Sequence, residues 1–464
     1  MANQLGNLVY GLDDVPPPDK AALAAIQHVL ASIVGIATPT LIIGGALGLG
    51  EHVPYLIAMA FFVSGVATFI QCRRIGPVGS GLLSLQGTSF AFLGAIIAAG
   101  FSVKNAGGTP EEILAMIFGL CLAGCVIEIV LSQFLDKLKR IITPTVTGIV
   151  ITIIGLSLVR TGFTDFAGGA GAGEELGAPR NLLMGFIVVT IILVLSFLGK
   201  PMLRISAIMI GLVIGTLIAI PLGMVNFGAV ANAQIFAVPV PFKFGLDFDL
   251  GLFIPLAFLY LVTAIETSGD LTANSIISGQ PVRGPLYLSR IKGGVLGDGV
   301  NSAIAAVFNT FPNTTFSQNN GVIQMTGVAS RHVGLWIAGF LVIMGLFPVI
   351  GSLFLVVPKP VLGGATLVLF GTIAVAGIRI LASEEMDQRR IYIIAVSFGL
   401  ALGVVLVPEA TQHLPVFLKQ VVATPITLAG LSAIILSLVL PESMGAKAEV
   451  EGDAIGAEAS QQPA

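Results

Sequence analysis

The chain has 464 residues, of which 55% are hydrophobic and only 10% are Asp, Glu, Lys or Arg, and its mean hydropathy is +0.98. Soluble domains carry about 25% charged residues, so this composition excludes a soluble globular protein and predicts an all-α polytopic membrane protein embedded in the lipid bilayer. The net charge of −3 excludes a strongly basic protein, and no nucleic-acid partner is expected.

Fourteen segments are predicted to cross the membrane, because most of them reach the roughly 20 apolar residues that a spanning helix needs. Two segments, 79–100 and 311–331, contain glycine and polar residues and are predicted to be discontinuous. In chain order the segments cover residues 21–49, 54–72, 79–100, 111–133, 143–163, 181–199, 205–225, 251–280, 292–310, 311–331, 333–357, 360–381, 390–408 and 425–441. Residues 1–20 contain no cleavable signal sequence, so the first segment is expected to remain in the protein.

The basic residues predict the orientation of these segments. Of the 22 Lys and Arg residues, fourteen lie in loops after even-numbered segments, six lie in loops after odd-numbered segments, and two lie in the tails. Basic residues concentrate in cytoplasmic loops, so the even-numbered loops and both termini are predicted to be cytoplasmic. This alternation holds only if residues 311–331 cross the membrane. The basic residues counted include Lys137, Lys139, Arg140, Lys419 and Lys447.

Residues 311–331 form the most polar stretch within the apolar part of the chain. An unsatisfied polar group in hydrocarbon costs several kcal/mol, so this segment is expected to line a polar cavity at membrane depth. The β-branched and aromatic run 314–316 predicts a short extended piece, and Asn319 or Asn320 is expected to cap a helix that begins near Gly321. The segment 79–100 has the same pattern around residues 87–90.

A weak internal repeat relates the two halves of the chain. The sequence PTVTGIVITIIGLSLV begins at Pro144, and PVLGGATLVLFGTIAVAG begins at Pro360, seven segments later. The two discontinuous segments are also seven apart. An odd number of spans reverses orientation, so the halves are predicted to form a 7+7 inverted repeat, in which paired interrupted segments mark a transporter binding site.

Ionisable residues inside the predicted spans are candidates for function. Glu266 and Asp270 are four residues apart, so both lie on one helix face and will not both be ionised without a cation or donors nearby. This arrangement suits a proton-coupled carrier, although Asp270 could instead bond a neighbouring helix. Asp298 could contact substrate or lock helices together, and His28 could relay protons or be a hydrogen-bonded core residue. Glu128 is interpreted as structural.

Two extended segments that meet inside the membrane would expose backbone donors and acceptors beside Gln86 and Gln318. Such a site suits a neutral or weakly acidic planar solute, on which Phe90 or Phe316 could stack. An anion would require Lys or Arg inside the spans, where none is predicted. The cysteines form no metal-ligand pattern, and no Ser or Cys is paired with a base, so neither a metal, nor an organic cofactor, nor an enzyme is expected.

The run QNNGVIQMTG, residues 318–327, resembles the signature of the nucleobase–ascorbate transporter family, also called nucleobase:cation symporter-2. The resemblance extends over nearly the whole chain through GPVGSGLLSLQGTSF, AIETSGDLTA, GGVLGDGVNS and QNNGVIQMTGVASR, and within the family it is greatest to the bacterial xanthine permeases. It implies proton symport of a purine by an elevator-like cycle in the bacterial inner membrane, usually as a homodimer.

The resemblance also implies a division of the chain into core and gate domains. Spans 1–4 and 8–11 would form the core, and spans 5–7 and 12–14 would form the gate. The corresponding ranges are core 21–140 and 251–357, gate 141–225 and 360–441, and cytoplasmic tails 1–20 and 442–464.

Residue by residue, the resemblance implies a purine site and its support. The implied substrate-binding residues are Glu266, Gln318, Asn319, Ser89 and the backbone donors Phe90 and Ser317. The residues implied for proton coupling or support are Glu266, Asp270, Asp298 and His28, and those for selectivity are Thr326, Gly327 and Ser89. Ser89 departs from the Asn of some xanthine-selective relatives, and its smaller side chain would leave room for uric acid.

The sequence therefore predicts a proton-coupled xanthine permease that could also accept uric acid. A uracil or other nucleobase symporter is the nearest alternative within transport. An anion exchanger or channel of the same architecture, and a receptor or scaffold without transport, are the alternatives from other classes.

Overall fold

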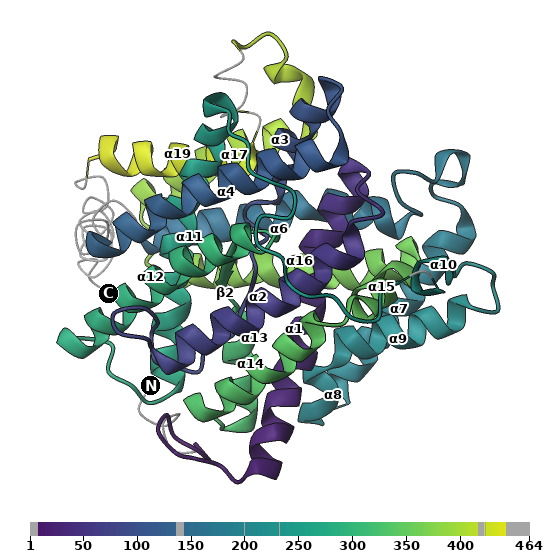
Figure 1. Ribbon diagram of the computed structural model, residues 1–464. Helices are drawn as coiled ribbons and strands as arrows, with labels where there is room; N and C mark the ends of the chain where they lie inside the picture. Colours follow the sequence, from purple (N-terminus) through teal and green to yellow (C-terminus); the bar gives the residue numbers. More distant parts are fainter. Residues whose placement is uncertain are drawn as a thin grey trace, which may run out of the picture. The chain divides into compact units, whose positions relative to one another are not determined.

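The computed structural model describes residues 8–135, 143–198, 200–231, 233–415, 422 and 424–441. The regular structure of these residues is helical apart from two strands of three residues each, as Figure 1 shows. The predicted helical class is therefore confirmed. Lys137, Lys139, Arg140, Lys419 and Lys447 lie outside the described residues, as do residues 1–7 of the predicted N-terminal tail and the whole predicted C-terminal tail.

The elements follow the predicted segments closely. In chain order they are α1 (Pro18–Leu47), α2 (Val53–Arg73), β1 (Gln86–Thr88), α3 (Leu93–Asn105), α4 (Pro110–Gln133), α6 (Pro144–Phe166), η1 (Gly173–Glu175), α7 (Pro179–Phe197), α8 (Pro201–Ile205), α9 (Ala207–Ala219), α10 (Gly228–Ala231), α11 (Leu250–Ile277), α12 (Pro285–Val307), β2 (Asn313–Thr315), α13 (Ser317–Thr326), α14 (Arg331–Gly345), α15 (Pro348–Val356), α16 (Lys359–Ala382), α17 (Gln388–Leu406), η2 (Pro408–Thr411) and α19 (Pro425–Val439).

Local sequence explains where many of these helices begin. Proline is the first residue of α1, α4, α6, α7, α12, α15 and α19. Proline suits this position because the first helical N–H has no intrahelical acceptor and the ring already fixes a helical φ. At α4 a capping box adds to this effect, since Thr109 Oγ1 accepts from the Glu112 N–H while the Glu112 carboxylate accepts from the Thr109 N–H.

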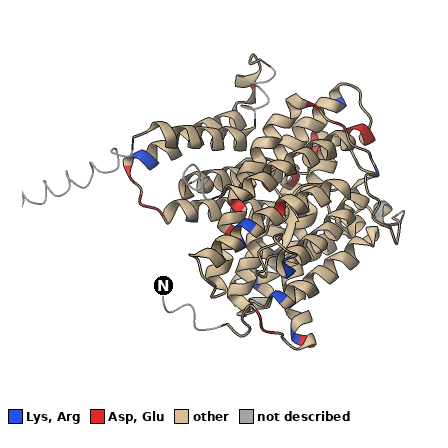
Figure 2. Ribbon diagram, turned by 60° about the vertical axis from the view of Figure 1, so that its left-hand side comes forward, with Lys and Arg blue, Asp and Glu red and all other residues tan. Residues whose placement is uncertain are grey.

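Membrane-length helices are abundant in the described part of the chain. Eight of its helices are long and apolar enough to cross a bilayer, and a ninth span is possible if α14 and α15 are counted as one bent pair. The shorter apolar helices α3, α9 and α19 fall within further predicted segments. Figure 2 shows how few charged residues interrupt these helices. The protein is therefore a multi-pass membrane protein.

The predicted span 333–357 is interrupted by a sharp bend that the apolar pattern did not reveal. It consists of α14 and α15, which are bent by 78° relative to one another. Pro348 stands at the start of α15 and has no N–H to continue the hydrogen-bond ladder, so the helix breaks immediately before it.

The described chain divides into two compact units. Unit 1 comprises residues 1–135 and 159–370, and unit 2 comprises residues 136–158 and 371–464. Within unit 2, glycines allow the backbones of α6 and α16 to approach, because a Cβ at Gly155 would lie 2.4 Å from the Ala374 nitrogen and one at Gly377 would lie 2.4 Å from the Thr152 nitrogen. Also in unit 2, α17 packs on α19, and Arg389 donates to the Leu440 carbonyl at 2.9 Å.

Unit 1 contains both discontinuous segments. In it α2 packs against α14, and α4 packs against both α11 and α12. Gly79 (φ +100°) and Gly81 (φ +71°) turn the chain between α2 and β1, in a left-handed conformation that other residues rarely adopt. This turn lets the chain re-enter the unit as the short strand β1.

Candidate functional site

The two discontinuous segments meet through their strands. β1 pairs antiparallel with β2 in the register Gln86 with Thr315, Gly87 with Thr314, and Thr88 with Asn313. The Ser89 N–H extends the pairing by donating to the Pro312 carbonyl at 2.8 Å. All six strand residues are buried, and Figure 1 shows β2 close to α12 and α13. The predicted meeting of two short extended pieces is thereby confirmed, and it satisfies their backbone groups inside the unit.

A helix follows each strand and begins at the same small sheet. α3 begins at Leu93 after β1, and α13 begins at Ser317 after β2. The first N–H groups of a helix lack internal acceptors and carry partial positive charge. Among the described residues, the N–H groups of Phe90 and Ser317 donate to no acceptor. These two predicted backbone donors are therefore available to a ligand's oxygen or ring nitrogen.

The predicted capping role of Asn319 or Asn320 was wrong. α13 begins at Ser317, before both asparagines, and its N-cap residue is Phe316. The Asn319 side chain instead donates to the Leu83 carbonyl at 2.7 Å, and the Asn320 side chain donates to the Asp270 carbonyl at 3.1 Å. The asparagines thus tie α13 to the irregular chain before β1 and to α11.

Glu266 lies in the middle of α11, which packs against both β2 and α13. Its Oε2 atom is buried and has no hydrogen-bond partner among the described residues. Its acidic neighbours are Asp270 and Asp298. A buried carboxylate without a protein donor is costly unless it is protonated or bound to a ligand donor, so Glu266 is the strongest candidate for direct contact with a ligand.

Asp270 lies one turn after Glu266 on the same helix. Its Oδ2 atom accepts from the Thr315 hydroxyl at 3.2 Å. The alternative in which Asp270 bonds the neighbouring helix around GGVLGDGVNS does not match this contact, because Thr315 belongs to β2. Asp270 therefore couples α11 to the strand pair.

Asp298 lies on α12 and is fully buried, where it joins several elements. Its Oδ1 atom accepts from Gln71 Nε2 of α2 at 2.8 Å, and its Oδ2 atom accepts from the Thr267 hydroxyl of α11. Gln71 also donates to the Gly294 carbonyl at 2.8 Å. A buried carboxylate with two donors from separate helices fixes their relative positions, which matches the locking role considered for Asp298.

His28 and Glu128 are both fully buried. The polar neighbour of His28 is Asn319, although neither imidazole nitrogen forms a hydrogen bond of normal geometry with a described residue. His28 therefore lies next to α13 and supports Asn319, the residue that follows Gln318. Glu128 Oε1 accepts from the Thr263 hydroxyl at 3.4 Å, which places Glu128 at the contact between α4 and α11.

Phe316, Phe90 and Ser89 lie near the strand pair and make different contacts. The Phe316 ring lies over Gly87, where an added Cβ would be 2.4 Å from Phe316 Cζ. The Phe90 ring meets Phe370 edge-on, with 5.7 Å between centroids. Ser89 is buried, and its Oγ accepts from the Ala91 N–H at 3.3 Å. Phe316 is thus used for packing between backbones, which leaves Phe90 as the better candidate for ring contact with a ligand.

Gln318 and two of the residues predicted for selectivity, Thr326 and Gly327, lie at opposite ends of α13. Gln318 is half-buried at the first turn, next to Asn319. Thr326 and Gly327 lie at the C-terminal end, and at a rise of 1.5 Å per residue Thr326 is about 12 Å from Gln318 along the axis. Gly327 has a φ of +69° and ends the helix. The structure therefore brings Glu266, Asp270, Asn319 and Gln318 into one region but separates Thr326 and Gly327 from it.

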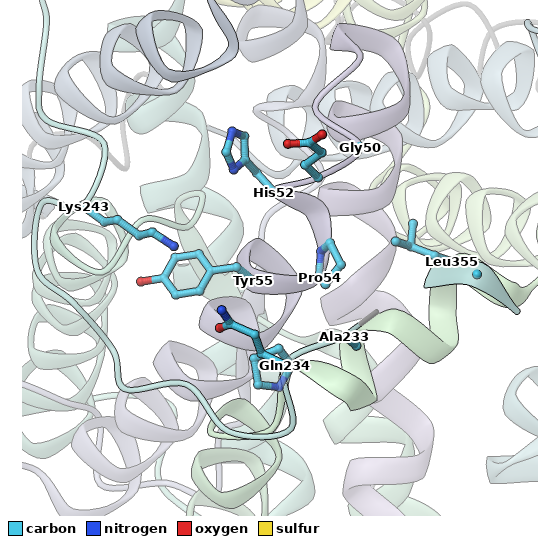
Figure 3. A pocket seen from close by; sticks show the side chains of 11 residues that line it. Gly50, His52, Pro54, Tyr55, Ala233, Gln234, Lys243 and Leu355 are labelled. Carbon is cyan, nitrogen blue, oxygen red and sulfur yellow. The ribbon is translucent and has the colours of Figure 1, made fainter. Parts of the chain in front are cut away.

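A cavity of about 480 Å³ lies elsewhere in unit 1 (Figure 3). It is lined by residues that include Tyr55, Gln234, Lys243 and Pro348, and it shares no residue with the predicted site. The Lys243 ammonium lies 3.8 Å from the centre of the Tyr55 ring, and burial lowers the pKa of Lys243. The carboxylate that lines this cavity, Glu51, is exposed, whereas Glu266 Oε2 is buried, so the strand pair remains the better candidate site.

The residues that hold the carboxylates in place were not predicted from the sequence. These are Thr315 for Asp270, and Gln71 and Thr267 for Asp298. Gln71 is the single amide side chain within residues 53–73, and that rarity could have marked it. Thr267 and Thr315 stand next to residues already selected, but their partners depend on tertiary contacts.

Membrane-length helices surround the two strand–helix segments, β1 with α3 and β2 with α13, and the buried carboxylates. This arrangement defines the protein as a membrane transporter and not an enzyme. The model of the permease family Xan_ur_permease matches residues 19–410, and the chain belongs to this family. The prediction that the chain is a member of a nucleobase permease family is thereby confirmed.

Two relatives from Escherichia coli strain K12 are similar over nearly the full chain. Xanthine permease XanP is 45% identical over 443 residues, which cover 94% of this chain and 96% of XanP. Xanthine permease XanQ is 44% identical over 438 residues, with 94% of each chain covered. A putative purine permease of Schizosaccharomyces pombe is 32% identical over 446 residues, which cover 86% of this chain and 73% of that protein.

Solved structures share the fold at low sequence identity. The transmembrane domain of the cyanobacterial bicarbonate transporter BicA has a TM-score of 0.54 and 16% identity, with 92% of this chain and 99% of that chain covered. The murine anion transporter Slc26a9 has a TM-score of 0.56 and 14% identity, with 86% and 70% covered. This similarity concerns the fold alone.

Proposed function

We propose that the protein takes up xanthine, with uric acid as a second substrate, by proton symport. The observation that carries the proposal is the 45% identity to a xanthine permease across 94% of the chain. The buried, partnerless Oε2 of Glu266 beside α13 supports it, because a xanthine ring offers N–H donors to a carboxylate and carbonyl acceptors to an amide.

In this proposal Glu266 accepts a ring N–H, and the Gln318 amide bonds the pyrimidinedione edge. Asn319 holds Gln318 in place through its bond to Leu83, and the N–H groups of Phe90 and Ser317 meet ring acceptors. Ser89 borders the imidazole side and leaves room for the additional oxygen of uric acid.

The proton is assigned to the carboxylate pair on α11. Glu266 or Asp270 takes a proton when substrate binds and releases it on the other side, while Asp298 and His28 support the site. Glu266 and Asp270 are one turn apart without a cation among their described contacts, an arrangement that favours protonation of one of them. No cofactor other than the proton enters the cycle.

The transport cycle is proposed to be an elevator in a fourteen-span, 7+7 inverted-repeat fold. The core (21–140 and 251–357) would carry the purine past the gate (141–225 and 360–441). The protein would act as a homodimer in the bacterial inner membrane, with the tails 1–20 and 442–464 in the cytoplasm. The opposed half-helices α3 and α13 support this proposal, since such pairs occur at the midplane of inverted-repeat transporters.

Uptake of labelled xanthine into cells tests the proposed function. Glu266→Gln is expected to lower kcat/KM about 10- to 100-fold, since a hydrogen bond to a charged group contributes about 1.5–3 kcal/mol. Glu174→Gln, a change of the same type at an exposed residue of η1, is the matched control and should leave uptake unchanged. Unlabelled uric acid should compete while uracil should not, and an uncoupler should abolish accumulation. Stronger competition by uracil, or unaltered uptake in Glu266→Gln, would overturn the assignment.

A further inference from the structure

Residues 8–14, called the N-terminal strap below, are not a free tail. The strap runs beside residues 327–331, and Tyr10 forms a parallel bridge with Val328. The N–H groups of Val9 and Tyr10 donate to the Gly327 carbonyl at 2.8 and 3.2 Å. In return, the Ala329 N–H donates to the Tyr10 carbonyl at 2.9 Å. A segment at the start of the chain is thus hydrogen-bonded to the residues that directly follow α13.

Side chains add to this backbone contact. The Arg331 N–H donates to the Leu12 carbonyl at 3.0 Å, and the Arg331 guanidinium pairs with Asp13 at 2.6 Å. The Ser330 hydroxyl donates to the Asp14 carbonyl at 2.5 Å. Leu12 is buried, with 4% of its surface exposed. The strap therefore makes several backbone bonds and an ion pair with one short stretch, and its Leu12 is buried, which a segment that touches the surface by chance does not do.

The strap attaches to the end of α13 opposite the candidate site. At its first turn α13 is held by Asn319 and Asn320, and directly after its last residue the C-cap Gly327 carbonyl accepts from both strap N–H groups. Because α13 is a single helix of ten residues, a shift of Gly327 reorients the helix and moves Gln318 at its other end. The family model begins at residue 19, so the strap lies outside the region that defines the family.

We propose that the N-terminal strap is a positioning element of the permease, with Asp13 as its key side chain. It holds the Gly327 end of α13 and so fixes the direction in which α13 presents Gln318 to the substrate. This would give Thr326 and Gly327, for which the family resemblance implies a role in selectivity, a way to act on Gln318 from about 12 Å along the helix. The transport part of this inference rests on the proposed function, whereas the docking of the strap does not.

Hydrogen exchange on the purified full-length protein tests the docking. In a variant that lacks residues 2–14, the amides of Ala329 and Arg331 are expected to exchange at least about tenfold faster, because both lose their acceptors. Asp13→Asn should give a smaller increase, and Asp13→Glu should restore protection. Asp19→Asn is the matched control, since Asp19 is exposed at the start of α1. Equal protection in the wild type and the deletion variant would overturn the proposal.

Xanthine uptake tests the positioning. The deletion should raise KM about fivefold with the maximum rate per transporter retained, and Asp13→Asn should raise it about twofold. If the deletion variant does not reach the membrane, the charge exchange Asp13→Arg with Arg331→Asp tests the proposal instead. Each single change should raise the KM, and the double change should restore the wild-type KM. An unaltered KM in Asp13→Asn and in both single changes would overturn the proposal. If the wild type takes up no xanthine, the proposed function fails, and hydrogen exchange alone decides the role of the strap.

Discussion

The two discontinuous segments have the same backbone plan but different side chains. Each consists of a three-residue strand followed by a helix, and the strands pair with one another. α3 is an apolar helix, whereas α13 carries Gln318, Asn319 and Asn320 in its first turn. Each side offers one backbone donor, Phe90 after β1 and Ser317 after β2, but the β2 and α13 side supplies most of the polar side chains.

The largest expected effect comes from separating the two strands. Gly87→Ala would place a Cβ 2.4 Å from the Phe316 ring, and the strand pair would have to open. We expect uptake to fall about 100-fold, because a misplacement of about 1 Å at a reacting or binding site has that effect. Gly339→Ala is the control, as a Cβ there meets nothing within 4 Å. Normal uptake in Gly87→Ala, measured per transporter in the membrane, would show that the pairing is not needed.

A second substitution sharpens the contrast between the two sides. Gln318→Ala should raise the KM for xanthine about 10- to 30-fold, since it leaves a buried ligand carbonyl without its donor. Gln324→Ala is the matched control on the same helix, because Gln324 is exposed. Competition assays with labelled xanthine measure both. Equal values for the two variants would place the purine away from the first turn of α13.

Thr315→Val tests whether β2 acts through the carboxylates. The change removes the hydroxyl that donates to Asp270 at 3.2 Å while nearly keeping the side-chain shape. Loss of one such bond should lower uptake about fivefold. Thr190→Val is the control, since the Thr190 hydroxyl bonds only the Phe186 carbonyl of its own helix. Uptake equal to that of the control would show that Asp270 takes no part in the transport cycle through this bond.

The smallest expected effect concerns selectivity on the β1 side. Ser89→Asn should change the KM for xanthine by less than about threefold and should abolish competition by uric acid, because added volume in a close pocket discriminates by about 1–3 kcal/mol. If uric acid still competes in Ser89→Asn, Ser89 does not border the imidazole side of the site.

Much of this arrangement could be predicted from the sequence. Apolar length located the helices, and the polar, β-branched runs around residues 87–90 and 314–316 predicted the paired extended pieces. The i, i+4 spacing of Glu266 and Asp270 placed both on one face of α11. These features depend on local periodicity, which a single sequence carries.

The remaining features depend on contacts between distant residues. The start of α13 was misplaced because Asn319 bonds Leu83 and not its own helix, and no local pattern reveals that acceptor. The hydrogen bond between Gln71 and Asp298 joins residues that are 227 positions apart in the sequence. The strap was interpreted as part of a cytoplasmic tail, because its hydrogen bonds with residues 327–331 are formed mainly by backbone groups and no local pattern reveals their partners.

An experimental map of the purified protein with bound xanthine tests the central claim most directly. The account predicts purine density between the Glu266 carboxylate and the first turn of α13, with Gln318 in hydrogen-bond contact and the N–H groups of Phe90 and Ser317 directed at ring acceptors. Saturable xanthine binding with the purine in another place, such as the cavity beside Tyr55 and Lys243, would contradict it.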